Sequence, residues 1–268
     1  MQPVRPATVL CVLVGAGAAV LVGLADAEGA DLFDTPRLIN LDTGVVVAQS
    51  RWNLSADFRA FGEPEGLTRG SVEVGYGAAR DWEIDLVYAF GGRDLFDTGR
   101  VLLRYGGTSL EVRGKYSIKR SEKTAVAGVV GIEFPNTPAQ GDVFANLQAP
   151  ISHSLGPDVT AHVVPKIVFL EDNTLFTVGL GIEARLDDRI RLMAEWSPIL
   201  AGDNTRNRFG ALTEDDVWGV ALRFLPGDRE DVTIDVGVTN ATGRTASLSL
   251  EPGLKDSAAF YGSLNWRP

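Results

Sequence analysis

Ionisable side chains of both signs recur at every second position in many segments of the chain. In the segment Trp82–Phe90, Glu83 and Asp85 alternate with Ile84 and Leu86. Two carboxylates on one face of a strand cannot lie in an ordinary core without partners. Such a face predicts either the wall of a water-filled path or a set of ion pairs that seals the interior. The candidate lining residues are Asp57, Arg59, Glu83, Asp85, Glu111, Arg113, Lys115, Glu133, Glu183, Arg185, Arg191, Glu195, Arg223 and Asp235.

A serine and histidine cluster invites comparison with nucleophilic catalysis. Ser152 and Ser154 flank His153, and His162 follows closely. Adjacent residues on one strand point to opposite faces, so Ser152 and His153 cannot easily meet as nucleophile and base. The sequence also has no Gly-x-Ser-x-Gly elbow. We therefore predict that the protein is not an enzyme and has no catalytic residues.

Two further charged groups could bind ions. Glu111 and Glu133 could face one another and attract a cation, but Arg113 is close enough to neutralise them, and no histidine or cysteine cluster accompanies them. We predict no metal site and no cofactor. A basic group near one rim, formed by Lys115, Lys119, Arg120 and Lys123, could attract anions or face lipid phosphates.

The elements that carry these residues are short segments in which apolar and polar residues alternate, which predicts β-strands. In Trp82–Phe90 the outward set is aromatic at both ends and aliphatic between, which suits lipid outside and water inside. Twelve such segments can be identified: Ala48–Phe61, Ser71–Ala78, Trp82–Phe90, Leu110–Lys119, Thr124–Phe134, Asp142–Ser154, Val159–Phe169, Phe176–Leu186, Ile190–Trp196, Trp218–Phe224, Val232–Thr239 and Phe260–Trp266.

The connections between these segments alternate between short turns and longer loops, and aromatic residues gather at both strand ends. The fold class predicted is all-β, a transmembrane antiparallel up-and-down β-barrel of about 12 strands. The alternative is a soluble all-β protein with the apolar face inside. Pro150 and Pro165 each remove a ladder donor, so we expect bulges or local weakness there.

The N-terminus has the features of a secretory signal: an early Arg5, an apolar run, and Ala25-Asp26-Ala27 as a cleavage site. A retained membrane helix is the alternative. The predicted organisation is a signal peptide over residues 1–27, a periplasmic lead-in over 28–47 and an outer-membrane barrel over 48–268. The only cysteine, Cys11, lies in the signal. The net charge of −10 does not suggest nucleic acid as a partner.

Several segments resemble an uncharacterised family of bacterial outer-membrane β-barrels, a barrel domain of unknown function. The matching residues are 38–40 with Thr43, and the segments 58–62, 74–77 and 115–120. The resemblance implies the barrel fold and the outer membrane, without an established activity. The last strand is also similar to an outer-membrane assembly signal, with Gly262, Leu264 and Trp266 at alternate positions, followed by Arg267 and Pro268.

These observations favour a narrow porin-like channel for passive transport of small solutes, with both termini in the periplasm. Twelve strands lie between small barrels that side chains fill and large barrels that enclose a channel. The alternative is therefore a sealed structural barrel whose outer loops, notably Gly91–Gly107 and Ala201–Asp215, engage partners. The expected partners are outer-membrane lipid, lipopolysaccharide and the barrel assembly machinery, and the solute is not identified.

Overall fold

The computed structural model describes residues 33, 36–62, 68–91, 108–136, 143–171, 173–206, 212–227, 231–253 and 258–268. No helix in these ranges is long and apolar enough to cross a membrane. The strands are β1 (Trp52–Phe61), β2 (Thr68–Ala79), β3 (Trp82–Gly91), β4 (Thr108–Arg120), β5 (Thr124–Asn136), β6 (Phe144–Gln148), β7 (Ile151–Gly156), β8 (Val159–Phe169), β9 (Thr174–Arg185), β10 (Ile190–Ser197), β11 (Ile199–Ala201), β12 (Thr205–Arg206), β13 (Leu212–Thr213), β14 (Val217–Phe224), β15 (Val232–Thr239) and β16 (Ala259–Trp266).

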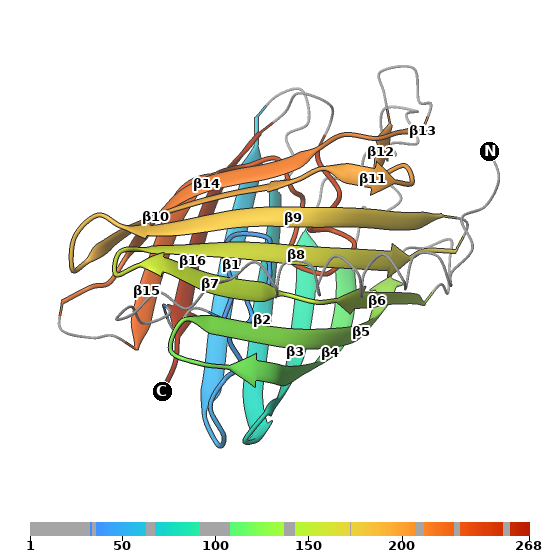
Figure 1. The fold of residues 1–268 in the computed structure, drawn as a ribbon. Coiled ribbons are helices and arrows are strands. Elements are labelled where there is room, and N and C mark those ends of the chain that lie inside the picture. Colours follow the sequence, from blue (N-terminus) through green and yellow to red (C-terminus); the bar gives the residue numbers. More distant parts are fainter. Residues whose placement is uncertain are drawn as a thin grey trace.

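All strands except the small β12–β13 hairpin join one antiparallel sheet that closes on itself (Figure 1). Strands β6 and β7 share one position between β5 and β8, and β11 continues β10 beside β9. The described strands therefore form a closed barrel of twelve positions, as predicted. The seam lies between the first and last strands, where Leu54 stands opposite Trp266.

Proline marks the two interruptions. Ala149 and Pro150 separate β6 from β7, which confirms the expected weakness there, whereas β8 runs through Pro165 without a break. Pro198 separates β10 from β11 in the same way. A proline has no N–H for the ladder, so pairing is interrupted at these positions.

The alternation of the sequence decides which side of the wall each residue occupies. On β3, Ile84 and Leu86 are 51% and 44% exposed, whereas Glu83 and Asp85 are each 2% exposed. The apolar face thus points outward, as in a membrane barrel and opposite to a soluble sandwich. Aromatic residues extend this outer surface: the rings of Trp82 and Tyr116 pack with centroids 4.9 Å apart.

Tight turns and longer connections alternate around the ring and define two ends. The end that carries the β2–β3, β4–β5, β7–β8 and β9–β10 turns is called the turn end here, and the opposite end is the loop end. Strand β1 begins and strand β16 ends at the turn end, since Trp52 pairs with Tyr76 and Leu54 with Trp266. Both chain ends of the barrel domain therefore lie at one mouth.

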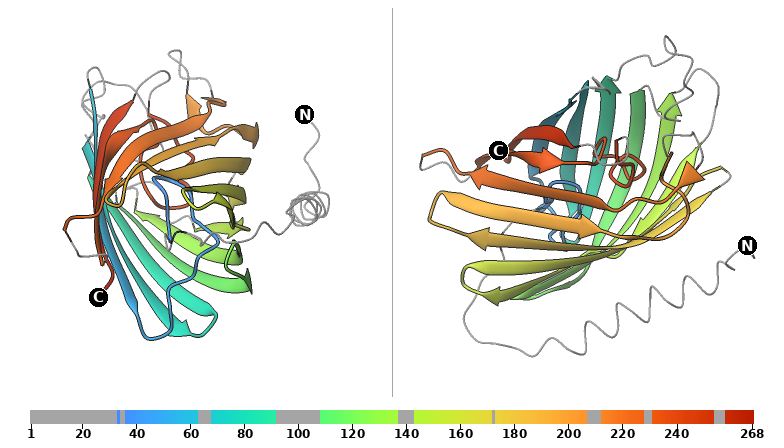
Figure 2. Two further views of the ribbon diagram at one scale, coloured as in Figure 1. Left: turned by 60° about the vertical axis from the view of Figure 1, so that its left-hand side comes forward. Right: turned by 90° about the horizontal axis from the view of Figure 1, so that it is seen from above.

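Two segments fill the interior of the barrel (Figure 2). The first, called the N-plug, comprises residues 36–47; the second, the C-plug, comprises residues 240–253 between β15 and β16. Leu38, Ile39 and Leu41 of the N-plug are almost completely buried, as are Leu248 and Leu250 of the C-plug. Both plugs lie inside the wall rather than on its rim.

Two predicted segments belong to the N-terminal part of the chain. The predicted signal peptide, residues 1–27, lies outside the described residues. The predicted lead-in is residues 28–47, and its described part from Pro36 to Val47 lies within the lumen. Leu38, Ile39 and Leu41 pack there against Val164 and Met193, apolar side chains on the inner face of the wall.

Candidate functional site

The wall places all the predicted lining residues toward the barrel interior. Twelve of these fourteen side chains are buried, while Arg185 is exposed and Arg191 partly exposed at the turn-end mouth. The placement explains how so many charges are accommodated: they contact one another and the two plugs. Three clusters of contacts account for most of them.

The first cluster is centred on Arg113, on β4. Its guanidinium forms ion pairs with Glu73 at 2.6 Å, with Asp85 at 3.3 Å and with Asp42 of the N-plug at 3.3 Å. Arg37 of the N-plug adds a second cation to Glu73, at 3.1 Å. Burial raises the pKa of Asp42, but Arg113 and Arg37 outweigh burial and hold this pKa below its ordinary value.

The second cluster connects the wall between β9 and β15. Arg223 forms an ion pair with Asp235 at 2.7 Å and lies 3.6 Å from Glu183, which also contacts Arg191 at 3.2 Å. The second Arg223–Asp235 hydrogen bond, 2.8 Å long, makes this pair bidentate. Bidentate guanidinium–carboxylate pairs are among the strongest charged contacts in proteins.

The third cluster joins β1 to the C-plug. Asp57 pairs with Arg59 at 2.9 Å and lies 3.8 Å from Arg244 of the C-plug. Arg59 also donates hydrogen bonds to the Ala241 carbonyl and to the Asn40 side chain, both within 2.9 Å. The Arg59 guanidinium therefore contacts the wall and both plugs.

Glu111 and Glu133 stand opposite each other on β4 and β5, as their spacing predicts. Each accepts one hydrogen bond from a wall residue, Glu111 from Asn146 and Glu133 from Ser109, and the other donors come from the C-plug. Ser247 donates its N–H and its hydroxyl to Glu133, Thr245 donates its hydroxyl to Glu133, and the Ala246 N–H reaches Glu111. Among the described residues, no group of three potential metal ligands lies together. These two carboxylates hold the C-plug in place.

Two other wall carboxylates bind the backbone of the N-plug. Glu195 accepts hydrogen bonds from the N–H groups of Asn40 and Leu41, at 3.0 and 3.2 Å. Glu83 accepts a hydrogen bond from the Val47 N–H at 2.9 Å. The N-plug has little regular secondary structure, so these wall groups satisfy backbone donors that would otherwise be buried without partners.

Ser152 and His162 meet across the β7–β8 pair, with Ser152 Oγ and His162 Nδ1 2.9 Å apart. The sequence suggests His153 as the first histidine to consider beside Ser152, because the two are neighbours in the chain. The structure instead brings Ser152 together with His162, ten residues further along. Ser152 Oγ also accepts a hydrogen bond from the Gly44 N–H, at 2.8 Å. Both side chains are buried beneath the N-plug, so the pair serves as one of its attachment points.

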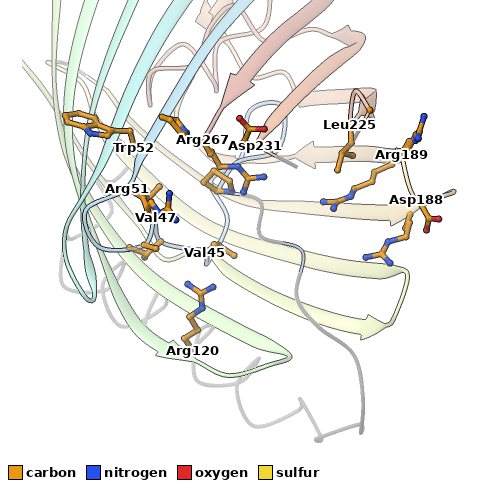
Figure 3. A pocket seen from close by; sticks show the side chains of 17 residues that line it. Val45, Val47, Arg51, Trp52, Arg120, Asp188, Arg189, Leu225, Asp231 and Arg267 are labelled. Atoms are coloured by element: carbon orange, nitrogen blue, oxygen red, sulfur yellow. The ribbon is translucent and has the colours of Figure 1, made fainter. Parts of the chain in front are cut away.

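A cavity of 1090 Å³ occupies the turn-end mouth (Figure 3). Its lining includes Val45–Val47 of the N-plug, together with Trp52, Leu225 and Pro268. Among the described residues, six arginines and two aspartates line it: Arg51, Arg120, Arg185, Arg189, Arg191 and Arg267, with Asp188 and Asp231. Arginine is thus the commonest charged residue in the described lining, although the chain as a whole has a net charge of −10.

The plug residues are the functional positions that sequence reasoning missed. Arg37, Asp42 and Arg244 carry charges that the wall requires, but they lie in segments without strand alternation. The sequence of the wall strands did contain a signal that a segment fills the lumen. Val164 and Met193 point inward among charged residues, and a buried apolar side chain there requires an apolar partner inside the lumen.

The fold can be compared with known proteins at this point. No protein-family model matches the sequence, and no curated protein matches it. The barrel is similar to the KdgM porin in complex with disordered oligogalacturonate (TM-score 0.56, 8% identity, 80% of this chain and 98% of that chain). It is also similar to the NanC porin (0.55, 8%, 80% and 98%) and to an outer membrane channel from Pseudomonas putida F1 (0.51, 10%, 91% and 99%). At these identities the likeness shows the fold alone: a closed antiparallel barrel of the outer-membrane porin type.

Proposed function

We propose that the protein is a porin-like channel of the bacterial outer membrane for passive transport of small solutes, seen here in a closed state. The observation that carries the proposal is the combination of a closed barrel, an apolar outer belt and a charged inner wall that continues into an open cavity. The turn end would face the periplasm, because short turns lie on that side in bacterial outer-membrane barrels.

The similar structures support the proposal. Those with the same barrel are described as porins or as an outer membrane channel, and one of them, the KdgM porin, was solved in complex with oligogalacturonate. An enzymatic role receives no comparable support. Among the described residues, Ser152 and His162 come nearest to a catalytic pair, and the Gly44 N–H donates a hydrogen bond to Ser152 Oγ.

Passage of a solute requires that the plugs move, because they fill the lumen between the cavity and the loop end. The N-plug is the better candidate for movement. Its backbone is attached through hydrogen bonds to Glu83 and Glu195, and it reaches the lumen from the turn end, where the cavity is open. Withdrawal of residues 36–47 would extend the cavity inward along the charged wall.

Planar-bilayer conductance of the purified protein tests the proposal. We expect discrete current steps from the wild type, and more frequent openings from the double variant Glu83→Gln, Glu195→Gln, whose hydrogen bonds to the N-plug are weaker. The matched control is Asp235→Asn, because Asp235 is also a buried wall carboxylate but pairs with Arg223 and Ser263 on the wall. A folded protein that passes no current in any of these forms would contradict a channel.

The second candidate is a sealed barrel with a structural or partner-binding role, and the filled lumen favours it. The loops that the sequence singled out for this role are only partly described. Gly91–Gly107 lies outside the described residues apart from Gly91. In the described part of Ala201–Asp215, Asn204 donates hydrogen bonds to the Asp215 and Leu250 carbonyls, so this loop covers the C-plug.

A further inference from the structure

We propose that the inner wall carries a binding site for short peptides with branched apolar side chains, which the N-plug occupies in the closed state. The site is called the glycine socket and consists of Gly179, Gly181 and Gly219 with the apolar residues Val164, Met193, Ala221 and Tyr261. The inference rests on the proposed function and names the class of solute that the channel would take up. Two sets of contacts support it, one to side chains and one to the peptide backbone.

Each glycine of the socket leaves room for one apolar side chain of the N-plug. The matching pairs are Gly181 with Leu38, Gly179 with Leu41 and Gly219 with Ile39. A Cβ added to the glycine would lie 2.5 Å from the nearest leucine carbon in the first two pairs and 3.0 Å from the isoleucine carbon in the third. These separations are shorter than van der Waals contact between carbon atoms. The wall is therefore shaped for branched apolar groups at three neighbouring places.

A carboxylate lies at the centre of the socket. Strand β10 places Glu195 directly between Gly181 of β9 and Gly219 of β14. Glu195 accepts hydrogen bonds from the N–H groups of Asn40 and Leu41, at 3.0 and 3.2 Å. A ligand made only of hydrocarbon would leave this buried carboxylate without those donors, which is costly. The socket therefore favours a ligand that combines apolar groups with N–H donors.

Two cations of the wall bind carbonyl oxygens of the same segment. Lys115 of β4 donates a hydrogen bond to the Pro36 carbonyl at 3.4 Å, and Arg223 of β14 donates one to the Arg37 carbonyl at 3.2 Å. A carboxylate that accepts from N–H groups and cations that donate to carbonyls together match the two polar groups of a peptide bond. Because these contacts involve backbone atoms, a separate peptide can make them as the N-plug does.

The N-plug competes with such a peptide at an advantage, because it belongs to the same chain and is present at an effective concentration of the order of mM. A variant whose N-plug fits the socket poorly should expose the site. The double variant Leu38→Ala, Leu41→Ala provides this form. The probe is the hexapeptide Arg-Leu-Ile-Asn-Leu-Asp, the sequence of residues 37–42, with an acetylated N-terminus and an amidated C-terminus.

Calorimetric titration of this peptide into the intact protein in uncharged micelles tests the site. We expect saturable binding to the double variant, binding at least about tenfold weaker to the wild type, and no binding of a peptide with alanine at its three apolar positions. Adding Gly181→Ala to the double variant should weaken binding at least about tenfold, because the new Cβ occupies the space of a leucine methyl group. The matched control is Gly114→Ala on the outer face of β4, where an added Cβ lies 3.9 Å from the nearest atom and should leave the affinity unchanged.

The outcomes separate this inference from the proposed function. Current without peptide binding to the double variant would overturn the site and leave the channel; peptide binding by a protein that passes no current would keep the site and overturn the channel. Equal binding of the alanine peptide, equal affinities of the wild type and the double variant, or no effect of Gly181→Ala would also overturn the site. If the double variant does not fold, Ile39→Ala takes its place.

Discussion

Replacing Glu133 by glutamine should loosen the C-plug while leaving the strand pairing of the wall in place. Glu133 accepts four hydrogen bonds, of which three come from the C-plug: the Thr245 hydroxyl at 2.7 Å, the Ser247 hydroxyl at 2.7 Å and the Ser247 N–H at 3.1 Å. The fourth comes from Ser109 on the wall. The variant Glu133→Gln keeps the shape of the side chain, removes its charge and converts one acceptor atom into a donor.

The expected size of the effect follows from these contacts. A hydrogen bond to a charged group contributes about 1.5–3 kcal/mol and one between neutral groups about 0.5–1.5 kcal/mol, so each of three bonds weakens by about 1 kcal/mol. Relief of repulsion from Glu111, directly opposite, offsets part of this loss. If attachment of the C-plug is weakened by a net of about 2–3 kcal/mol, the population of the detached C-plug becomes roughly 30- to 150-fold larger.

Hydrogen–deuterium exchange measures this population directly. Peptides that contain Ala246 and Ser247 should exchange faster by about this factor, because their N–H groups bond to Glu111 and Glu133. The reciprocal control is Glu195→Gln, which should instead accelerate exchange in the N-plug around Asn40. Unchanged protection of the C-plug in Glu133→Gln would refute the assignment of this carboxylate as its anchor.

Three further changes test the lumen, the N-plug and the outer wall. Arg113→Gln removes the cation that Asp42, Glu73 and Asp85 share. Thermal unfolding should therefore show that the free energy of unfolding falls by about 3–5 kcal/mol. Gly44→Ala should increase proteolysis of residues 36–47, because a Cβ there meets wall backbone, whereas Gly62→Ala has open space and should not. Leu86→Arg on the lipid face should destabilise refolding into bilayers by about 2–4 kcal/mol, whereas Ile118→Arg, near the rim, should have an effect of about 0–1 kcal/mol. Equal effects of the last two would contradict a membrane belt.

The wall could be predicted because each strand carries its own evidence. In β3, the order Trp82, Glu83, Ile84, Asp85 fixes both the element and the side that each residue faces, since side chains alternate along any strand. The same rule gives the register partner of Glu111, because a short turn joins β4 to β5. Local pattern and short connections thus determine the barrel and its two faces.

The plugs could not be predicted in the same way. The C-plug consists mainly of small residues, among them the polar Thr245, Ser247 and Ser249, a composition typical of a surface loop. Its position depends on contacts with residues far away in the chain, including the hydrogen bond from Lys166 to Ser249. No periodicity encodes such pairings, and the number of strands leaves the contents of a barrel open.

The seam between β1 and β16 has a consequence for the order of assembly. Leu54 and Trp266 are neighbours in the sheet although they lie near opposite ends of the barrel domain, and the C-plug directly precedes β16. The last strand and the C-plug must therefore arrive together. Until they do, Arg59 and Asp57 of the first strand lack Ala241 and Arg244, and contacts so distant in sequence form slowly. We expect the sheet to stay open and filled with water until the C-plug and β16 dock. The interior should then lose its water in a single late step.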